Sequence, residues 1–195
     1  SEESIKIAKK RFEVFNLNGK LDVNNIENMT QNYEKYDLIY SFGVLHHTPN
    51  IDIAIENIYN MLENGGEFKL MLYAKNSWKY FAIKDGLDQY EAQSGVPIAN
   101  TYTHSSVFTL LKKFCNIKIF QTHIFPYKIP EYKEYKYIKE DYFDCMPNEL
   151  FKCLENNLGW HLCITCKKRN ILNEIYSIDN ISKPYEHIII KDMFD

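Results

Sequence analysis

The sequence predicts an α/β fold built on a parallel sheet. Residues 37–42 form an apolar run, residues 51–62 repeat apolar side chains at helical spacing, and residues 67–73 form a second apolar run. A strand, a crossover helix and a strand in this order make up the repeating unit of a parallel sheet. Polar residues follow the first run, at the carboxyl end of that strand, where open α/β sheets bind ligands.

Length and composition are typical of a soluble globular protein. The chain has 195 residues, 45% of them hydrophobic and 25% charged, which suffices for one domain and a short additional piece. A net charge of -3 gives no reason to expect nucleic acid or an anionic membrane as a partner. We find neither a membrane-spanning run nor a signal peptide. The five irregularly spaced cysteines argue against a disulfide framework and favour a reducing cytoplasm.

The first 28 residues predict a helix, a short strand and a polar turn. Ser1 suits a helix N-cap, and apolar side chains at 5, 8, 12 and 15 share one face of a helix over residues 1–15. The Asn18-Gly19 pair is expected to end this segment. Residues 20–23 read as a strand, and a polar run follows it.

The central block predicts two buried strands around a helix. The strand at 37–42 is so apolar that we expect both of its faces to be covered. The helix at 51–62 is expected to end at a C-cap formed by Gly65-Gly66, after which residues 67–73 form the next strand.

The second half is less regular. Residues 74–100 predict a helix and a loop, Thr103 suits the cap of a further helix, and Pro147 suits the first turn of another. The strands expected at 117–125 and 160–166 would pair antiparallel at the sheet edge. Charged residues become more frequent after Lys167 and the apolar core pattern fades. We therefore expect a domain over 1–169, and a linker or the start of a second module over 170–195.

Residues 36–73 resemble the class I S-adenosylmethionine-dependent methyltransferases, especially the small-molecule type 11 group. The block YDLIYSFGVLHHTPN is similar to the fourth strand of that family, and IENIYNMLENGGEFKLML to the helix and fifth strand that follow. Upstream, SEESIKIAKKRF resembles the helix after the second strand, and LDVNNIENM the third strand with its adenine-contacting turn. The expected strand pair at 117–125 and 160–166 is similar to the antiparallel edge hairpin of the fold.

The resemblance implies a partial doubly wound, Rossmann-like sheet, mainly parallel with an antiparallel edge strand. It also implies S-adenosylmethionine as the cofactor and methyl transfer to a small molecule. The strand, Gly-rich loop and ribose-binding acid that open the family's fold would lie before Ser1. We therefore expect the first strands to be missing, and the activity to belong to a longer parent rather than to this fragment alone.

Five residues match cofactor-contacting positions of the family. Asn25 matches the position whose side chain faces the adenine amine, and Ile26 would offer a backbone N–H to the ring. Ser41, Phe42 and Gly43 end the strand that flanks the sulfonium in the resembling enzymes, and glycine permits close approach of a ligand. The alternatives are an ordinary polar turn and a plain strand end.

His46 and His47 are the candidate catalytic residues. A histidine with a pKa of about 6.5 can accept a proton from a substrate hydroxyl, amine or carbon acid. A structural role for both rings is the alternative. We expect no metal site, because adjacent histidines ligate one ion poorly and Cys163 and Cys166, three apart on a strand, point to opposite faces.

Candidate substrate-binding residues lie in the loops after the second apolar strand. Tyr73, Asn76 and Trp78 follow that strand, and Tyr102 and His104 lie near the next helix. Tyrosines crowd the excursion at 126–145, which would suit either a substrate lid over a planar ligand or a solvated surface loop.

Two other functions stay open. A binding or scaffold module can keep this fold without its chemistry. An NAD(P)-dependent oxidoreductase is disfavoured, because no Tyr-x-x-x-Lys pair follows a strand-end serine in the expected place. The tail, in which residues 188–190 read as a strand, resembles the opening of iron- and 2-oxoglutarate-dependent hydroxylase domains, but the iron-binding triad of that family is absent.

Overall fold

A computed structural model describes residues 1–29, 34–85, 99–170, 179–182 and 186–189. The helices are α1 (Glu2–Val14), α2 (Ile51–Met61), α3 (Trp78–Lys84), α4 (His104–Leu110), α5 (Ile129–Lys133), α6 (Asp141–Asp144) and α7 (Asn148–Leu158), with 3-10 turns η1 (Ile26–Asn28) and η2 (Leu45–His47). The strands are β1 (Tyr36–Phe42), β2 (Leu62–Ala74), β3 (Thr101–Tyr102), β4 (Phe114–Thr122), β5 (His161–Lys168), β6 (Asp179–Ser182) and β7 (Glu186–Ile189).

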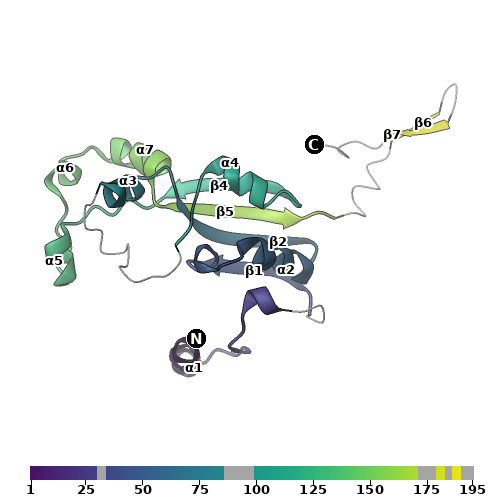
Figure 1. The fold of residues 1–195 in the computed structure, drawn as a ribbon, viewed down its shortest axis with the longest axis horizontal. Coiled ribbons are helices and arrows are strands. Elements are labelled where there is room, and N and C mark those ends of the chain that lie inside the picture. Colours follow the sequence, from purple (N-terminus) through teal and green to yellow (C-terminus); the bar gives the residue numbers. More distant parts are fainter. Residues whose placement is uncertain (30–33, 86–98, 171–178, 183–185, 190–195) are drawn as a thin grey trace.

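The main sheet has the order β1-β2-β5-β4, and the two-residue β3 pairs with the end of β2 (Figure 1). β1 and β3 run parallel to β2, whereas β5 runs antiparallel to both β2 and β4. This open sheet confirms the predicted fold class and the antiparallel pair at the sheet edge, of which β4 is the outer strand.

One face of the sheet carries the hydrophobic core. α2 and α4 lie on this face and bury Ile58 and Val107 against Phe68, Leu72 and other apolar side chains of the strands. The helical stripe predicted for residues 51–62 is the buried face of α2, with Ala54, Ile55, Ile58 and Met61 buried. The burial of these side chains against the sheet is the largest source of stability for this part of the fold.

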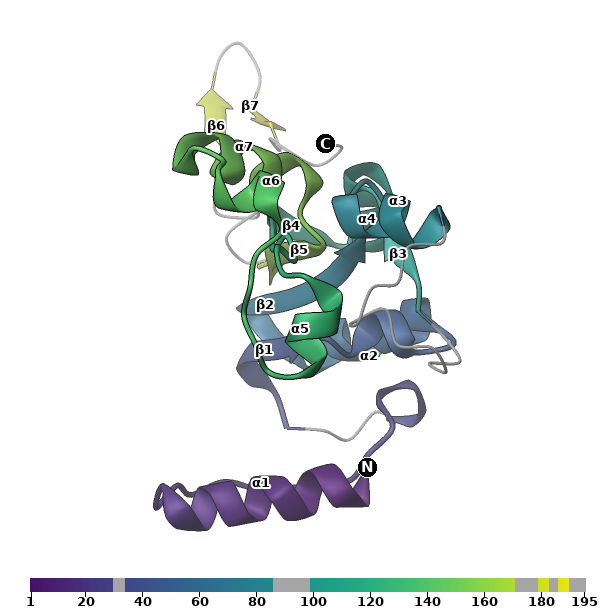
Figure 2. The same cartoon turned by 90° about the vertical axis from the view of Figure 1, so that its left-hand side faces the viewer.

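The other face of the sheet is open in the described chain. Leu38, Tyr40, Phe42 and Phe120 are 48–65% exposed and alternate with residues that face α2 or the core. The expectation that both faces of residues 37–42 are covered is therefore wrong for the described residues. α1 buries none of its side chains and lies apart from the sheet (Figure 2).

The helices of the second half gather at one end of the sheet. α3, α5, α6 and α7 lie beyond the carboxyl ends of β2 and β4, at the left of Figure 1. Because β5 is antiparallel, its first residues also lie at this end, which we call the carboxyl edge. α2 and α4 remain beside the sheet (Figure 2).

Four predicted details differ from the structure. Residues 20–23 form no strand; they lie exposed, with Lys20 paired to Asp22, and no described strand offers them a hydrogen-bonding partner. α2 ends at Met61, and Gly65-Gly66 lie inside β2 rather than at a helix cap. The predicted strand at 117–125 lies three residues earlier, at 114–122.

The glycine pair has a clear role within the strand. The register of β1 against β2 shifts between Tyr36 and Leu38, so β2 carries extra residues at this point. Gly65 has a positive φ of 79°, and a Cβ on Gly66 would lie 2.9 Å from the Glu63 oxygen. Glycine is suited to such a bulge because it tolerates both conditions.

Other predictions agree with the structure or lie outside it. Ser1 caps α1 by accepting from the Ser4 N–H, and Thr103 forms a capping box with Ser106 in α4. The loop predicted within 74–100 falls mostly on residues 86–98, outside the described residues. In the tail, β6 and β7 pair antiparallel, and the strand predicted at 188–190 overlaps β7 up to Ile189. In the described ranges no helix is long and apolar enough to cross a membrane.

Two of the isoleucines of α2 provide a test of the core. Ile58 is 2% exposed and Ile53 is 48% exposed on the same helix. We expect Ile58→Ala to lower the free energy of unfolding by about 2–5 kcal/mol, because it removes packed side-chain volume. The matched Ile53→Ala should change it by less than about 0.5 kcal/mol. Urea denaturation followed by circular dichroism measures both, and equal losses would contradict this description of the core.

Candidate functional site

The carboxyl end of β1 turns sharply at Gly43. This residue has a φ of 75°, in the left-handed region that favours glycine, and an added Cβ would meet only the Met71 methyl at 3.8 Å. Position 43 therefore favours glycine because of its backbone conformation, and not because a larger side chain would clash. Ser41 and Phe42 pair with Leu70 and Met71 of β2, so the predicted cofactor residues 41–43 lie at the carboxyl edge.

The predicted adenine turn is fixed to α2 and its N-cap. Asn25 caps η1, and its Oδ1 accepts from the Glu27 N–H at 2.9 Å. The Glu27 carboxylate accepts from the backbone N–H and the side-chain amide of Asn50, and the Asn57 amide donates to the Ile26 oxygen at 2.7 Å. Asn25 itself is exposed, and Ile26 packs against the core.

His46 is completely buried behind the end of β1. Its ring centroid lies 3.7 Å from that of Tyr73 and 4.2 Å from that of His47. Neither ring nitrogen has a hydrogen-bond partner among the described residues. Burial lowers the pKa of His46 to about 4, and nearby His47 and His161 add to this shift. His46 is therefore neutral near pH 7 and is placed to pack rather than to exchange protons.

His47 occupies a different environment. Its side chain is half-buried, and its ring meets the ring of Tyr73 edge-on at 5.6 Å. Of the two predicted catalytic histidines, His47 is thus the one with access to a ligand at the carboxyl edge.

Aromatic and imidazole rings continue from these histidines across the edge. Tyr73 stacks on Trp160 with centroids 4.3 Å apart, and His161 stacks on His123 at 4.4 Å. Phe42 meets His161 edge-on at 5.7 Å. Seven rings from five separate segments therefore lie together, and we call them the ring cluster: Phe42, His46, His47, Tyr73, His123, Trp160 and His161.

The other predicted substrate residues are distributed around this cluster. Trp78 begins α3 and packs against Tyr142 and Phe143 of α6, with centroids 6.2 and 5.8 Å away. The Asn76 oxygen accepts from the side chain of Gln121 at 2.7 Å. Tyr102 packs against the core, where burial raises its pKa, and His104 is exposed at the start of α4. Only Tyr73 of the five belongs to the ring cluster.

Sequence reasoning did not identify His123, Trp160, His161 or Gln121 as site residues. The predicted antiparallel pair of strands was the sequence feature that could have identified these residues. An antiparallel β5 places its first residues, and the last residues of β4, at the edge where the parallel strands end.

The tyrosine-rich excursion forms its own aromatic group. Tyr132 of α5 lies 4.8 Å from Phe125 and 5.7 Å from Tyr137, measured between ring centroids, and both contacts are nearly perpendicular. Such edge-to-face packing gives the excursion a small core of its own.

The structure offers no metal centre in the described residues. No group of three or more His, Cys, Asp or Glu side chains there is arranged to hold an ion. Cys163 and Cys166 lie on opposite faces of β5, one half-buried and one buried, as predicted from their spacing.

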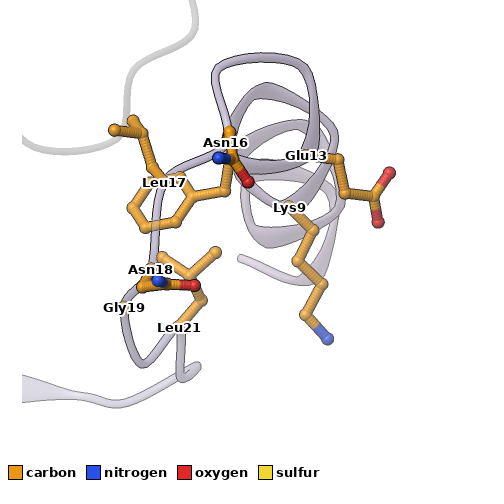
Figure 3. A pocket seen from close by; sticks show the side chains of 8 residues that line it. Lys9, Glu13, Asn16, Leu17, Asn18, Gly19 and Leu21 are labelled. Atoms are coloured by element: carbon orange, nitrogen blue, oxygen red, sulfur yellow. The ribbon is translucent and has the colours of Figure 1, made fainter.

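A hollow beside the end of α1 is separate from this edge. Figure 3 shows Leu17 and Leu21 lining it, with Lys9 and Glu13 extending from the helix. All of its lining residues belong to α1 or the loop that follows, so it contains none of the predicted site residues.

Comparisons with known proteins bear on the fold that carries this site. Residues 1–68 match the family model described as a methyltransferase domain. The solved YcgJ protein from Bacillus subtilis matches with a TM-score of 0.58 and 12% identity, over 87% of this chain and 80% of that chain. The fold is that of a class I methyltransferase. This confirms the resemblance seen in residues 36–73.

Two further solved structures have the same methyltransferase fold. A putative methyltransferase from Bacillus halodurans gives a TM-score of 0.52 at 16% identity, over 87% of this chain and 80% of that one. A methyltransferase from Thermotoga maritima, described as a possible histamine N-methyltransferase, gives 0.50 at 16% identity, over 75% of this chain. This chain spans 62% of that protein's length. No curated protein sequence matched.

The buried His46 predicts a loss of stability in acid. Its pKa of about 4 in the folded state lies below the ordinary value of 6.5, so the unfolded chain binds more protons between these values. The contribution of His46 to the free energy of unfolding is at its maximum above pH 6.5. It decreases by about 3 kcal/mol as the pH falls toward 4.

We expect His46→Phe to flatten this part of the profile, because phenylalanine does not titrate. The exposed His104→Gln should leave it unchanged. Urea unfolding at a series of pH values between 4 and 7 measures the effect. An unchanged acid slope in His46→Phe would contradict the neutral, buried state of this ring.

Proposed function

We propose that the protein transfers a methyl group from S-adenosylmethionine to a planar small molecule. The observation that carries this proposal is the carboxyl edge of a methyltransferase-type sheet, where the turn at Gly43 and the ring cluster lie together. We further propose a cytoplasmic protein whose partner is this small molecule and not nucleic acid or a membrane, with the methyltransferase domain ending near residue 169.

The described residues fit part of a site for S-adenosylmethionine, which when bound supplies an electrophilic methyl group on a sulfonium. The turn at Gly43 lets a ligand approach the backbone beside Ser41 and Phe42. Asn25 is exposed on a turn that hydrogen bonds anchor to α2. A carbonyl oxygen has two lone pairs, so Asn25 Oδ1 can cap Glu27 and still accept from an adenine amine.

The ring cluster supports a planar acceptor. Phe42 is half exposed, and His47, Tyr73 and His161 are partly accessible, whereas Trp160 supports Tyr73 from behind. We call the accessible faces of four of these rings the acceptor wall: Phe42, His47, Tyr73 and His161. Such a surface favours a flat aromatic or heteroaromatic molecule through stacking and burial. Trp78, also partly exposed, extends the aromatic surface toward α6.

His47 is the proposed proton acceptor. S-adenosylmethionine would supply the methyl group, and a hydroxyl oxygen or amine nitrogen of the acceptor would receive it, with the former carbon–sulfur electron pair left on sulfur. The proton released by the acceptor passes to the His47 imidazole. The other residues contribute mainly by aligning the two reactants.

Asn25 provides the first test, made in the full-length protein with S-adenosylhomocysteine as the probe. Asn25→Asp keeps both the cap of η1 and the acceptor for adenine, so binding should persist. Asn25→Ser keeps only a cap, so it should weaken binding about tenfold, the equivalent of one lost hydrogen bond. Isothermal titration calorimetry measures both affinities.

Equal affinities for the Ser variant and the unsubstituted protein would remove Asn25 from the site. A full-length protein that does not bind the probe at all would overturn the proposed cofactor and favour a binding module that lacks the chemistry.

His47 provides the second test. His47→Ala should lower the rate of methyl transfer by roughly 10²–10⁴ while changing affinity for S-adenosylhomocysteine little, because a general base acts on the transfer step. The assay uses S-adenosylmethionine with a labelled methyl group and a panel of planar phenols and heteroaromatic amines, with aliphatic amines for comparison. Lys112→Ala, exposed beyond the end of α4, is the control. An equal rate in His47→Ala would exclude this residue as the base.

A further inference from the structure

We propose that Gln121 is a positioning residue that sets the orientation of the Tyr73–Trp160 stack and thereby shapes the acceptor wall. This inference rests on the proposed function for the role of the wall. The geometry of the residue stands independently of that function.

Gln121 is a buried amide whose donors are both used. It is 7% exposed near the end of β4. Its Nε2 donates to the Asn76 oxygen and to the Gly159 oxygen, at 2.7 Å in each case. These backbone oxygens lie 45 and 38 residues away in sequence, so one side chain joins three segments at the carboxyl edge. We call this arrangement the amide clasp.

The Asn76 carbonyl lies directly before the N-cap of α3, and the Gly159 carbonyl lies directly before Trp160. Asn76 is followed by Ser77, whose hydroxyl caps α3 by accepting from the Tyr80 N–H. α3 carries Lys79, whose ammonium lies 5.2 Å from the centroid of the Trp160 ring. Gly159 immediately precedes Trp160. The amide clasp therefore fixes the chain on both sides of one cation–π contact.

The backbone around Trp160 has little freedom to adjust. A Cβ on Gly159 would lie 2.3 Å from the Thr122 oxygen, so only glycine fits there. The Trp160 N–H donates to the His123 oxygen at 2.7 Å, and its own oxygen accepts from the Ala74 N–H at 2.8 Å. The Gly159 carbonyl belongs to the same planar peptide as the Trp160 N–H, so Gln121 and the His123 oxygen hold this peptide from its two sides.

The amide clasp also joins the wall to the tyrosine-rich excursion. Trp78 follows Ser77 and packs on Phe143, which in turn meets Phe151 of α7 with centroids 5.7 Å apart. The Glu155 carboxylate of α7 accepts from the His123 N–H. A displacement of α6 or α7 would therefore also displace Trp160, because these helices contact the segments that Gln121 holds together.

Intrinsic fluorescence tests the proposal without requiring methyl transfer. The chain has two tryptophans, so Trp78→Phe leaves Trp160 as the only one. In this background, Gln121→Leu should raise the acrylamide quenching constant of the 5%-exposed Trp160 about twofold, because two buried carbonyls lose their donor. Gln121→Glu, which keeps the side-chain shape but offers no donor when ionised, should do the same.

Ile119→Ala is the matched control, since Ile119 lies two residues earlier on β4 and packs against the core. It should destabilise the fold without changing the quenching of Trp160. In the full-length protein, Gln121→Glu should lower the transfer rate to planar acceptors about tenfold and leave S-adenosylhomocysteine affinity within about twofold.

The outcomes separate this proposal from the proposed function. Unchanged quenching in both Gln121 variants, or the same change in Ile119→Ala, would overturn the positioning role. A full-length protein that fails to bind S-adenosylhomocysteine but shows the expected quenching would overturn the proposed function and leave the amide clasp in place.

Discussion

The backbone pairing of β5 between β2 and β4 is the constraint on which the rest of the structure depends. Leu70 of β2 pairs with Ile164 of β5, which pairs on its other side with Ile119 of β4. This ladder completes the sheet under α2 and α4. Because β5 runs against its neighbours, it also brings Trp160 and His161 to the edge where β1 and β2 end. Core and site therefore arise from one set of backbone hydrogen bonds.

Local patterns in the sequence were sufficient for much of the fold. The helical stripe of α2, the cap at Thr103 and the antiparallel pair at the sheet edge all follow from short-range spacing and are confirmed. Residues 20–23 show the limit of such patterns, because a strand also needs a neighbour to accept its hydrogen bonds. Gly65-Gly66 show another limit, since a helix stop and a strand bulge favour the same residue type.

The candidate site was less predictable, for physical reasons. The sequence pointed to the end of β1, and His46, His47 and Tyr73 do lie together there. It did not separate the two histidines, because burial and not residue type makes His46 a weak base. Gln121 gave no local signal, as its partners lie on two distant loops. Tertiary hydrogen bonds of this kind leave no periodicity in a sequence.

The long separation between β2 and its partner β5 has a consequence for synthesis of the protein. β1, α2 and β2 can associate as soon as residue 74 has left the ribosome, yet the edge of β2 opposite β1 gains its partner only after β5 emerges, some ninety residues later. During that interval β2 presents a free edge and apolar side chains to solvent. Such nascent chains are typical clients of chaperones, and slowing of translation within the excursion would prolong their exposure to aggregation.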